Sequence, residues 1–252
     1  MFNVRKTYLT FVIALIALIS LSLSSNPIHA ANCDGLPVTA GVLPAGTYTL
    51  TDNCVTTGTI FTNVGVTTIN GNGFTIDGNN THALFAIDAI DTLNLNNVTI
   101  QNGNGSGFNG GAIRATGVVN ITNSTVRNNT SPFDGGAIII DAGGVVTITN
   151  STVSDNTAPN DGGVVANYGT LNIVGSAFSG NMATVNGGVI NNQVAGVLTI
   201  SNSRFIGNSA NTYGGAINNV YTMANVTISN SVFTGNTADV GGAYADLAGG
   251  TI

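Results

Sequence analysis

The nonapeptide Ile148-Thr-Asn-Ser-Thr-Val-Ser-Asp-Asn156 decides the fold of this 252-residue chain, because variants of it recur from residue 95 onward. The first position advances by 26, 27, 25, 27 and 28 residues from copy to copy. A unit of this length cannot bury its apolar side alone, so consecutive units must stack. The copies begin at Leu95, Ile121, Ile148, Ile173, Ile200 and Ile228, and a degenerate seventh copy begins at Ile69.

Each copy is typical of three short strands broken by glycine and asparagine. Apolar and polar residues alternate in Val145–Asn150, as in a strand with two faces. Propeller blades take about 40 to 50 residues and leucine-rich repeats carry a helix or 3₁₀ turn, so both are disfavoured. We therefore predict an all-β fold, a right-handed parallel β-helix of about seven coils of roughly 27 residues. One core column is expected to contain Ile100, Val126, Val153, Phe178, Phe205 and Phe233.

Asparagine recurs at two phases of the repeat. An asparagine tolerates left-handed backbone at a turn and can bond to the amide of the copy above and below, which would make a ladder along the axis. We expect this structural role for both columns, in preference to contacts with a glycan or ligand. The first column is Asn97, Asn123, Asn150, Asn202 and Asn230, interrupted by Gly175, and the second is Asn129, Asn156, Asn181, Asn208 and Asn236.

Two short motifs resemble a known repeat family. FxxN tetrapeptides and GGAI segments together resemble the polymorphic outer-membrane protein repeats of chlamydial autotransporters and related exported bacterial β-helix proteins with pectin-lyase-like folds. The resemblance covers about residues 40–252 and implies a passenger-type, surface-exposed β-helix, often adhesive. Valine replaces the phenylalanine in two copies, at Val126 and Val153. The motifs are Phe178–Asn181, Phe205–Asn208, Phe233–Asn236, Gly135–Ile138 and Gly214–Ile217, and Leu43–Leu50 is similar to an opening strand of such proteins.

Residues 1–30 have the pattern of a secretory signal peptide. Arg5 and Lys6 precede an apolar run, Leu9–Leu23, and Ala30 offers a small residue for cleavage. The alternative is a membrane anchor, but the run is shorter than the roughly 20 residues that a spanning helix needs. We expect export, to the extracellular space or the bacterial cell surface.

The chain after residue 30 divides into two segments. Residues 31–68 lack the repeat and are expected to form an N-terminal cap and the first coil, whereas residues 69–252 form the β-helix repeats. The C-terminal end stops partway through a copy and is interpreted as truncated. The alternative is a terminus that a partner covers, for example by end-to-end association at the uncapped last coil.

The net negative charge of the chain disfavours binding to nucleic acids and to anionic membranes. After cleavage the chain retains three arginines and eleven aspartates, with no lysine and no glutamate, so its net charge is 3 − 11 = −8. Binding of nucleic acid needs clustered basic residues, which are absent. Anionic membranes are disfavoured for the same reason, and no membrane insertion is expected for this segment. Arg114, Arg127, Arg204 and the histidine His82 are expected to be surface residues.

Cys33 and Cys54 are the only cysteines. In an exported protein a pair this close is expected to form one disulfide, with two free thiols as the alternative. A lipid anchor at Cys33 is disfavoured because Asn32 precedes it.

Asp134 and Asp161 are the best candidates for a metal site. Each directly precedes a glycine pair, and Asn109 and Asn186 occupy the same phase. Oxygen ligands on adjacent coils could bind Ca²⁺, the only cofactor considered, but aspartate and asparagine also simply favour turns. No catalytic residue is assigned.

The function expected is a secreted or cell-surface scaffold, adhesin-like and without catalysis. Host cells, the cell wall or glycan surfaces are the expected partners. The alternative is a polysaccharide lyase or hydrolase, which would need a base or paired carboxylates. A less favoured alternative is ice binding by a hydroxyl array that includes Thr147, Thr149 and Thr199.

Overall fold

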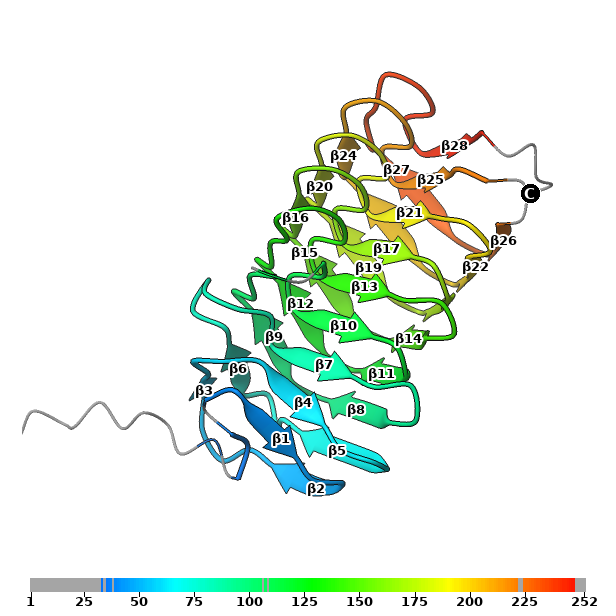
Figure 1. The fold of residues 1–252 in the computed structure, drawn as a ribbon. Helices are drawn as coiled ribbons and strands as arrows, with labels where there is room; N and C mark the ends of the chain where they lie inside the picture. The colour runs from blue at the N-terminus through cyan, green and yellow to red at the C-terminus, as the bar shows by residue number, and fades with distance from the viewer. Residues whose placement is uncertain are drawn as a thin grey trace, which may run out of the picture. The chain divides into compact units, whose positions relative to one another are not determined.

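The computed structural model describes residues 33, 35–37, 39–105, 107, 109–221 and 224–247. The expected signal peptide and the last residues of the chain, 248–252, lie outside the described residues. Within them every regular element is a strand, and each complete coil contributes one strand to each of three parallel sheets, named here A, B and C (Figure 1).

The three sheets have nine, eight and eight described strands. Sheet A contains β1 (Gly41–Leu43), β4 (Ile60–Thr62), β7 (Phe85–Ile87), β10 (Ile113–Ala115), β13 (Ile138–Ile140), β17 (Val165–Asn167), β21 (Ile190–Asn192), β25 (Ile217–Asn219) and β28 (Tyr244–Asp246). Sheet B contains β2 (Gly46–Thr49), β5 (Val66–Asn70), β8 (Thr92–Asn96), β11 (Val118–Thr122), β14 (Val145–Thr149), β18 (Thr170–Val174), β22 (Val197–Ser201) and β26 (Asn225–Ser229). Sheet C contains β3 (Cys54–Val55), β6 (Thr75–Asp77), β9 (Thr99–Gln101), β12 (Thr125–Arg127), β15 (Thr152–Ser154), β19 (Ala177–Ser179), β23 (Arg204–Ile206) and β27 (Val232–Thr234). A small fourth sheet contains β16 (Thr157–Ala158), β20 (Met182–Ala183) and β24 (Ser209–Ala210).

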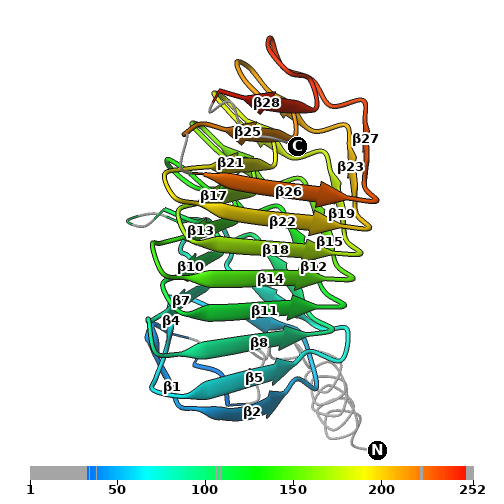
Figure 2. The same cartoon turned by 90° about the vertical axis from the view of Figure 1, so that its right-hand side faces the viewer.

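The stacked strands confirm the predicted parallel β-helix and its register. Ile148 pairs with Ile121 on the coil before and with Ile173 on the coil after, so the first positions of the repeat form one column. In Figure 2 the strands of sheet B run from left to right on the near side, sheet C follows on the right, and the coils rise toward the C-terminus, which is a right-handed path.

Apolar side chains of like position stack along the interior. Val126 pairs with Val153, and the rings of Phe178, Phe205 and Phe233 stack with centroids 4.7 Å apart between neighbours. The spacing matches the distance between adjacent strands, so one ring per coil fills the column without a gap. This column is the one that the repeat predicts.

The second asparagine column is a buried amide ladder. Asn156 donates from Nδ2 to Oδ1 of Asn181 at 3.0 Å, and the same oxygen accepts the backbone N–H of Asn156 at 3.1 Å. Asn156 Nδ2 also donates to the carbonyl of Val126 on the preceding coil at 3.1 Å. The pattern repeats along the helix, so these buried amides are hydrogen-bonded to one another and to the backbone. The successive Nδ2 to Oδ1 contacts are Asn129 to Asn156, Asn156 to Asn181, Asn181 to Asn208 and Asn208 to Asn236.

The first asparagine column serves a different purpose. These residues are exposed at the corner between sheets B and C and have φ values of 48° to 52°. Gly175, at the same position, has φ 60°. Left-handed backbone at the corner, which only glycine and asparagine adopt easily, therefore explains the column. Its members are Asn97, Asn123, Asn150, Asn202 and Asn230.

A ladder of serine side chains, which was not among the predicted features, directly follows this column. The hydroxyl of Ser151 donates to the carbonyl of Thr149 at 2.8 Å and accepts the N–H of Ser124 at 3.1 Å. Ser151 is buried, so its hydroxyl fills a bonding position that the turn leaves open. The ladder contains Ser124, Ser151, Ser176, Ser203 and Ser231.

Residues 41–55 already form a complete coil. Its three strands, β1, β2 and β3, join sheets A, B and C although they lack the repeat motif. The predicted disulfide is confirmed: Cys33 and Cys54 are bonded, both are buried, and their Cα atoms are 5.0 Å apart. The bond fastens the segment before β1 to the first strand of sheet C.

Candidate functional site

The outer face of sheet A carries one outward residue per strand, at the middle position. We call this column the outer row. Register pairs Phe61 with Ala86, Ala86 with Arg114, and Arg114 with Ile139. The complete row is Val42, Phe61, Ala86, Arg114, Ile139, Ala166, Asn191, Asn218 and Ala245.

The outer row is open over the first coils and covered over the later ones. Phe61 is 36% exposed and the side chain of Arg114 is 45% exposed, whereas Ile139 is 4% and Ala166 is 0% exposed. The cause is the length of the segment that leads from sheet C back to sheet A. It comprises residues 56–59 and 78–84 in the first two coils, but 128–137 and 180–189 in later coils.

The long segments fold over sheet A at their glycine pairs. A side chain at Gly110 would collide with the carbonyl of Ile113 and the backbone N of Ile139, and one at Gly162 would collide with the carbonyl of Val165. Gly162 also has φ 65°, which a side chain disfavours. The glycine pairs thus let each long segment lie directly on the outer row, and the short early segments leave the row open.

Asp161 lies at the centre of a polar network, in one of the segments that cover the later part of the outer row. Its Oδ1 accepts a hydrogen bond from Asn186 Nδ2 at 2.9 Å, and its Oδ2 accepts one from Asn191 Nδ2 at 2.8 Å. Gln193 Nε2 approaches the same Oδ2 at 3.4 Å, and Asn218 Nδ2 donates to Asn191 Oδ1 at 2.8 Å. Both oxygens of the carboxylate are therefore bonded to amide groups.

Burial and a neighbouring charge alter the acidity here. The pKa of Asp161 is raised, first by burial and then by the negative charge of Asp134, although hydrogen bonds from Asn186 and Gln193 oppose this. The pKa of Tyr168 is also raised, first by burial and then by the negative charges of Asp134 and Asp161. The cluster is thus acidic and rich in hydrogen-bond acceptors.

The structure brings Asp134 and Asp161 onto adjacent coils. The backbone N–H of Asp161 donates to Asp134 Oδ1 at 3.3 Å. Of the flanking asparagines, Asn186 bonds to Asp161, whereas no described hydrogen bond joins Asn109 to either aspartate. The described residues contain no group of three or more histidine, cysteine or acidic side chains that could hold a metal. Calcium binding therefore stays a prediction, and the amide donors on Asp161 occupy positions that Ca²⁺ would need.

A cavity of about 210 Å³ lies over the open part of the outer row. Consecutive strands of sheet A contribute Phe61, Ala86 and Arg114 to its lining. Because Ala86 is small, it leaves a notch between the two larger side chains. Ile87, Asp88 and Thr116 complete the lining.

One ion pair fixes the position of Arg114 in the lining of this cavity. Arg114 Nε donates to Asp141 Oδ2 at 2.7 Å, and the Thr116 hydroxyl donates to the same oxygen at 3.2 Å. The exposed residue Asp88 stands at the rim of the same cavity. The rim therefore offers a cation held by an ion pair and a solvent-exposed acceptor.

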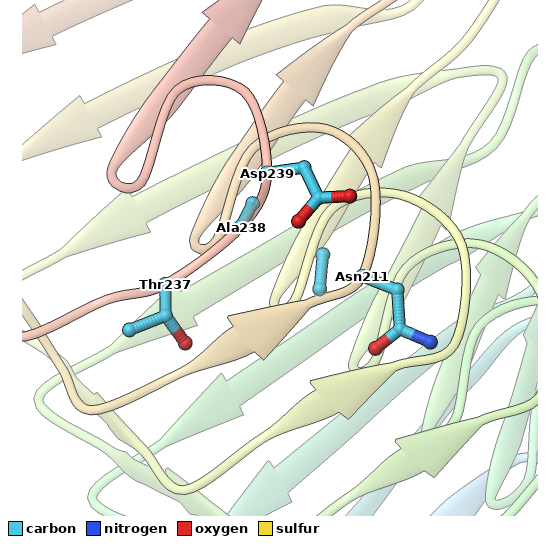
Figure 3. A pocket seen from close by; sticks show the side chains of 5 residues that line it. Asn211, Thr237, Ala238 and Asp239 are labelled. Atoms are coloured by element: carbon cyan, nitrogen blue, oxygen red, sulfur yellow. The ribbon is translucent and has the colours of Figure 1, made fainter.

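A second hollow, of about 480 Å³, is open to solvent beside β24 (Figure 3). Asn211 and Asp239 lie on adjacent loops, joined by a backbone hydrogen bond of 3.2 Å. Ala210, Thr237 and Ala238 complete its lining. Small side chains and a wide opening give a ligand little surface to contact, so we place the candidate site at the first cavity.

The outer face of sheet B carries the hydroxyl array considered for ice binding. Its strands contain no charged residue, and Thr147, Thr149 and Thr199 point outward. The array is broken by amides that bond across strands, such as Asn120 Nδ2 to Asn94 Oδ1 at 2.9 Å. In such pairs the amides use their hydrogen-bonding groups on each other, and they interrupt what would otherwise be a uniform array of hydroxyl groups.

The expectation of a surface His82 is wrong. The ring is 8% exposed, with Nε2 2.8 Å from Thr56 Oγ1 and Nδ1 2.7 Å from Thr81 Oγ1. Burial lowers the pKa of His82. The turn that holds it packs against the first coil, where no repeat motif signals an interior position.

The described residues include no helix with the length and hydropathy needed to cross a membrane. No protein-family model matches the chain, and neither curated proteins nor solved structures provide a match.

Proposed function

We propose that the chain is a rigid β-helix scaffold of the secreted or cell-surface type, which binds glycans or cell surfaces without catalysis. The hydrogen bonding of the Asp161 carboxylate is the observation that carries this proposal. Both of its oxygens accept hydrogen bonds from side-chain amides, of Asn186 and Asn191, so it acts as a structural acceptor. A general acid or nucleophile must instead present an oxygen to the substrate.

The basic residue nearest the open cavity supports the same conclusion. A lyase needs a base free to remove a proton, and arginine serves poorly because it is protonated at ordinary pH. Arg114 donates to Asp141 at 2.7 Å, so the ion pair fixes its position. Its position suits recognition of a ligand more than abstraction of a proton.

Rigidity supports a scaffold. Buried columns of asparagine and serine bond every later coil to the next, and a disulfide secures the first coil. Disulfides persist in oxidising compartments, which agrees with the proposed export. We further propose, from the FxxN and GGAI motifs, that the chain is related to the polymorphic outer-membrane protein repeats and acts as an adhesin.

A polysaccharide hydrolase is the second candidate, favoured by the raised pKa of Asp161 beside Asp134. The two functions separate experimentally. Residues 31–252 would be purified and incubated with neutral and acidic polysaccharides, with and without Ca²⁺, and both retention and product release would be measured. Retention without products supports the scaffold. Products that Asp134→Ala abolishes would establish the enzyme instead.

A further inference from the structure

We propose that the cavity formed by Phe61, Ala86, Ile87, Asp88, Arg114 and Thr116 binds one neutral pyranose ring of a glycan. This inference rests on the proposed binding function and assigns it a site and a ligand class. It begins from the position of the cavity, which is the part of the outer row that the short segments 56–59 and 78–84 leave open.

The size of the cavity limits the ligand. Phe61 and Arg114 stand two strand spacings apart, about 10 Å, with Ala86 between them. A volume of about 210 Å³ is below the range of about 300 to 1,000 Å³ of typical small-molecule sites. One six-membered sugar ring fits this notch, whereas a larger aromatic cofactor would extend beyond it.

The lining has the chemistry of a sugar site. The Phe61 ring, 36% exposed, offers a flat apolar face for the C–H side of a pyranose. The Asp88 carboxylate lies at the rim as an acceptor for sugar hydroxyl groups. The Thr116 hydroxyl already donates to Asp141, which leaves its oxygen able to accept. An apolar wall opposite polar groups matches a ligand with an apolar face and hydroxyl edges.

Local charge selects a neutral sugar. The formal charges near the cavity sum to −2 + 1 = −1, from Asp88, Asp141 and Arg114, and Arg114 is already paired with Asp141. A uronate or a phosphorylated sugar would bring a second negative charge to Asp88 without a free cation to offset it. We therefore expect neutral hexoses to bind better than hexuronates.

The covered row also limits how a glycan lies. Beyond Arg114 the row continues into Ile139, which is 4% exposed beneath the segment that contains Gly110. A glycan cannot continue in that direction along sheet A. The cavity therefore suits the terminal residue of a chain, with the remainder directed over the open face toward Val42, which is 59% exposed.

The test uses saturation-transfer NMR on purified residues 31–252 with the methyl glycosides of glucose, galactose, mannose and N-acetylglucosamine, and with galacturonate. At least one neutral glycoside should receive saturation at its ring C–H protons, and galacturonate should receive less. Phe61→Ala should weaken binding about tenfold or more, as loss of an aromatic anchor does. Phe133→Ala, at an exposed ring outside the cavity, should leave binding unchanged.

A second variant distinguishes loss of the binding site from a folding defect in Phe61→Ala. Ala86→Leu would fill the notch from its floor on an outward strand position and should also abolish binding. Absence of saturation for every neutral glycoside, or undiminished binding in folded Phe61→Ala and Ala86→Leu, would overturn the proposal. Retention on glycan or cell surfaces is measured in parallel. If both variants are retained like the wild type, the site is wrong while the binding function stands; if the wild type is not retained, the binding function fails.

Discussion

Asn156 Nδ2 lies 3.0 Å from Asn181 Oδ1 on the next coil, and that oxygen also accepts the backbone N–H of Asn156 at 3.1 Å. One side chain therefore joins two coils through two hydrogen bonds. Because the interior excludes water at this position, each bond has no alternative partner when it is broken. The ladder specifies which coils pair and prevents slippage between them.

Removing one member of the ladder should be costly. In Asn181→Ala the side chain and N–H of Asn156 lose their acceptor. Asn208 Oδ1 loses the side-chain donor of Asn181 and keeps the backbone N–H of residue 181. Buried polar groups without partners cost about 1–3 kcal/mol each, so we expect a loss of about 3 kcal/mol or more in the free energy of unfolding. Guanidinium unfolding of residues 31–252 measures it.

The matched control for the ladder is Asn150→Gly. Asn150 has φ 48° at an exposed corner, where Gly175 stands in the next coil. Glycine adopts this backbone without strain, so the free energy of unfolding should change by less than about 0.5 kcal/mol. Equal destabilisation by both substitutions would show that the buried ladder has no special role.

The disulfide should stabilise the first coil. Cys33 and Cys54 are separated by 21 residues, and closing a loop of this size contributes about 3 kcal/mol. The double substitution of both cysteines by serine should lower the denaturation midpoint and increase hydrogen exchange in β1 to β3. Hydrogen-exchange mass spectrometry locates the change. An increase confined to the last coils would contradict this account.

His82 should make stability depend on pH. Its pKa is lowered in the folded state, so the unfolded chain binds more protons once the pH falls below about 6.5. The stabilisation is complete above that value and is lost as the pH decreases through the folded pKa. Unfolding at pH 8, 6.5 and 5 should show this decrease. His82→Gln, which cannot titrate, should show a smaller slope over the same window; an unchanged slope would assign the effect to other groups.

Calcium should have little effect on stability. Asp161 has both oxygens bonded to amides, so Ca²⁺ would have to displace Asn186 and Asn191. Melting temperatures with millimolar Ca²⁺ and with chelator should differ by no more than about 1 °C, which corresponds to a small binding free energy. A rise of several degrees that Asp134→Asn removes would restore the predicted calcium site.

The repeat was sufficient to predict the coil. Ile148 and Phe178 recur at fixed phase with apolar equivalents, and stacking follows because each unit has only its neighbours to pack against. The serine ladder was missed although a serine stands at the same phase in each of the five copies from Ile121 onward, for example Ser151. Serine is common in turns, so composition alone does not separate a buried hydroxyl from an exposed one.

The candidate cavity could not be predicted in the same way. Phe61 lies in a segment without the repeat, and the open part of the outer row depends on the short connections 56–59 and 78–84. The notch also requires Phe61, Ala86 and Arg114 to be in register across three coils. Neither relationship is visible before the strands are aligned. His82 was misassigned for the same reason, because the residues that bury it are distant in sequence.

The most direct test of the central claim combines binding and chemistry in one tube. Residues 31–252 are sedimented with insoluble polysaccharides and cell walls, and the supernatant is analysed for reducing ends and unsaturated products. We predict that the protein pellets with at least one of these surfaces and releases no product. Soluble products that disappear in Asp134→Ala, or no sedimentation with any surface, would contradict a scaffold that binds without catalysis.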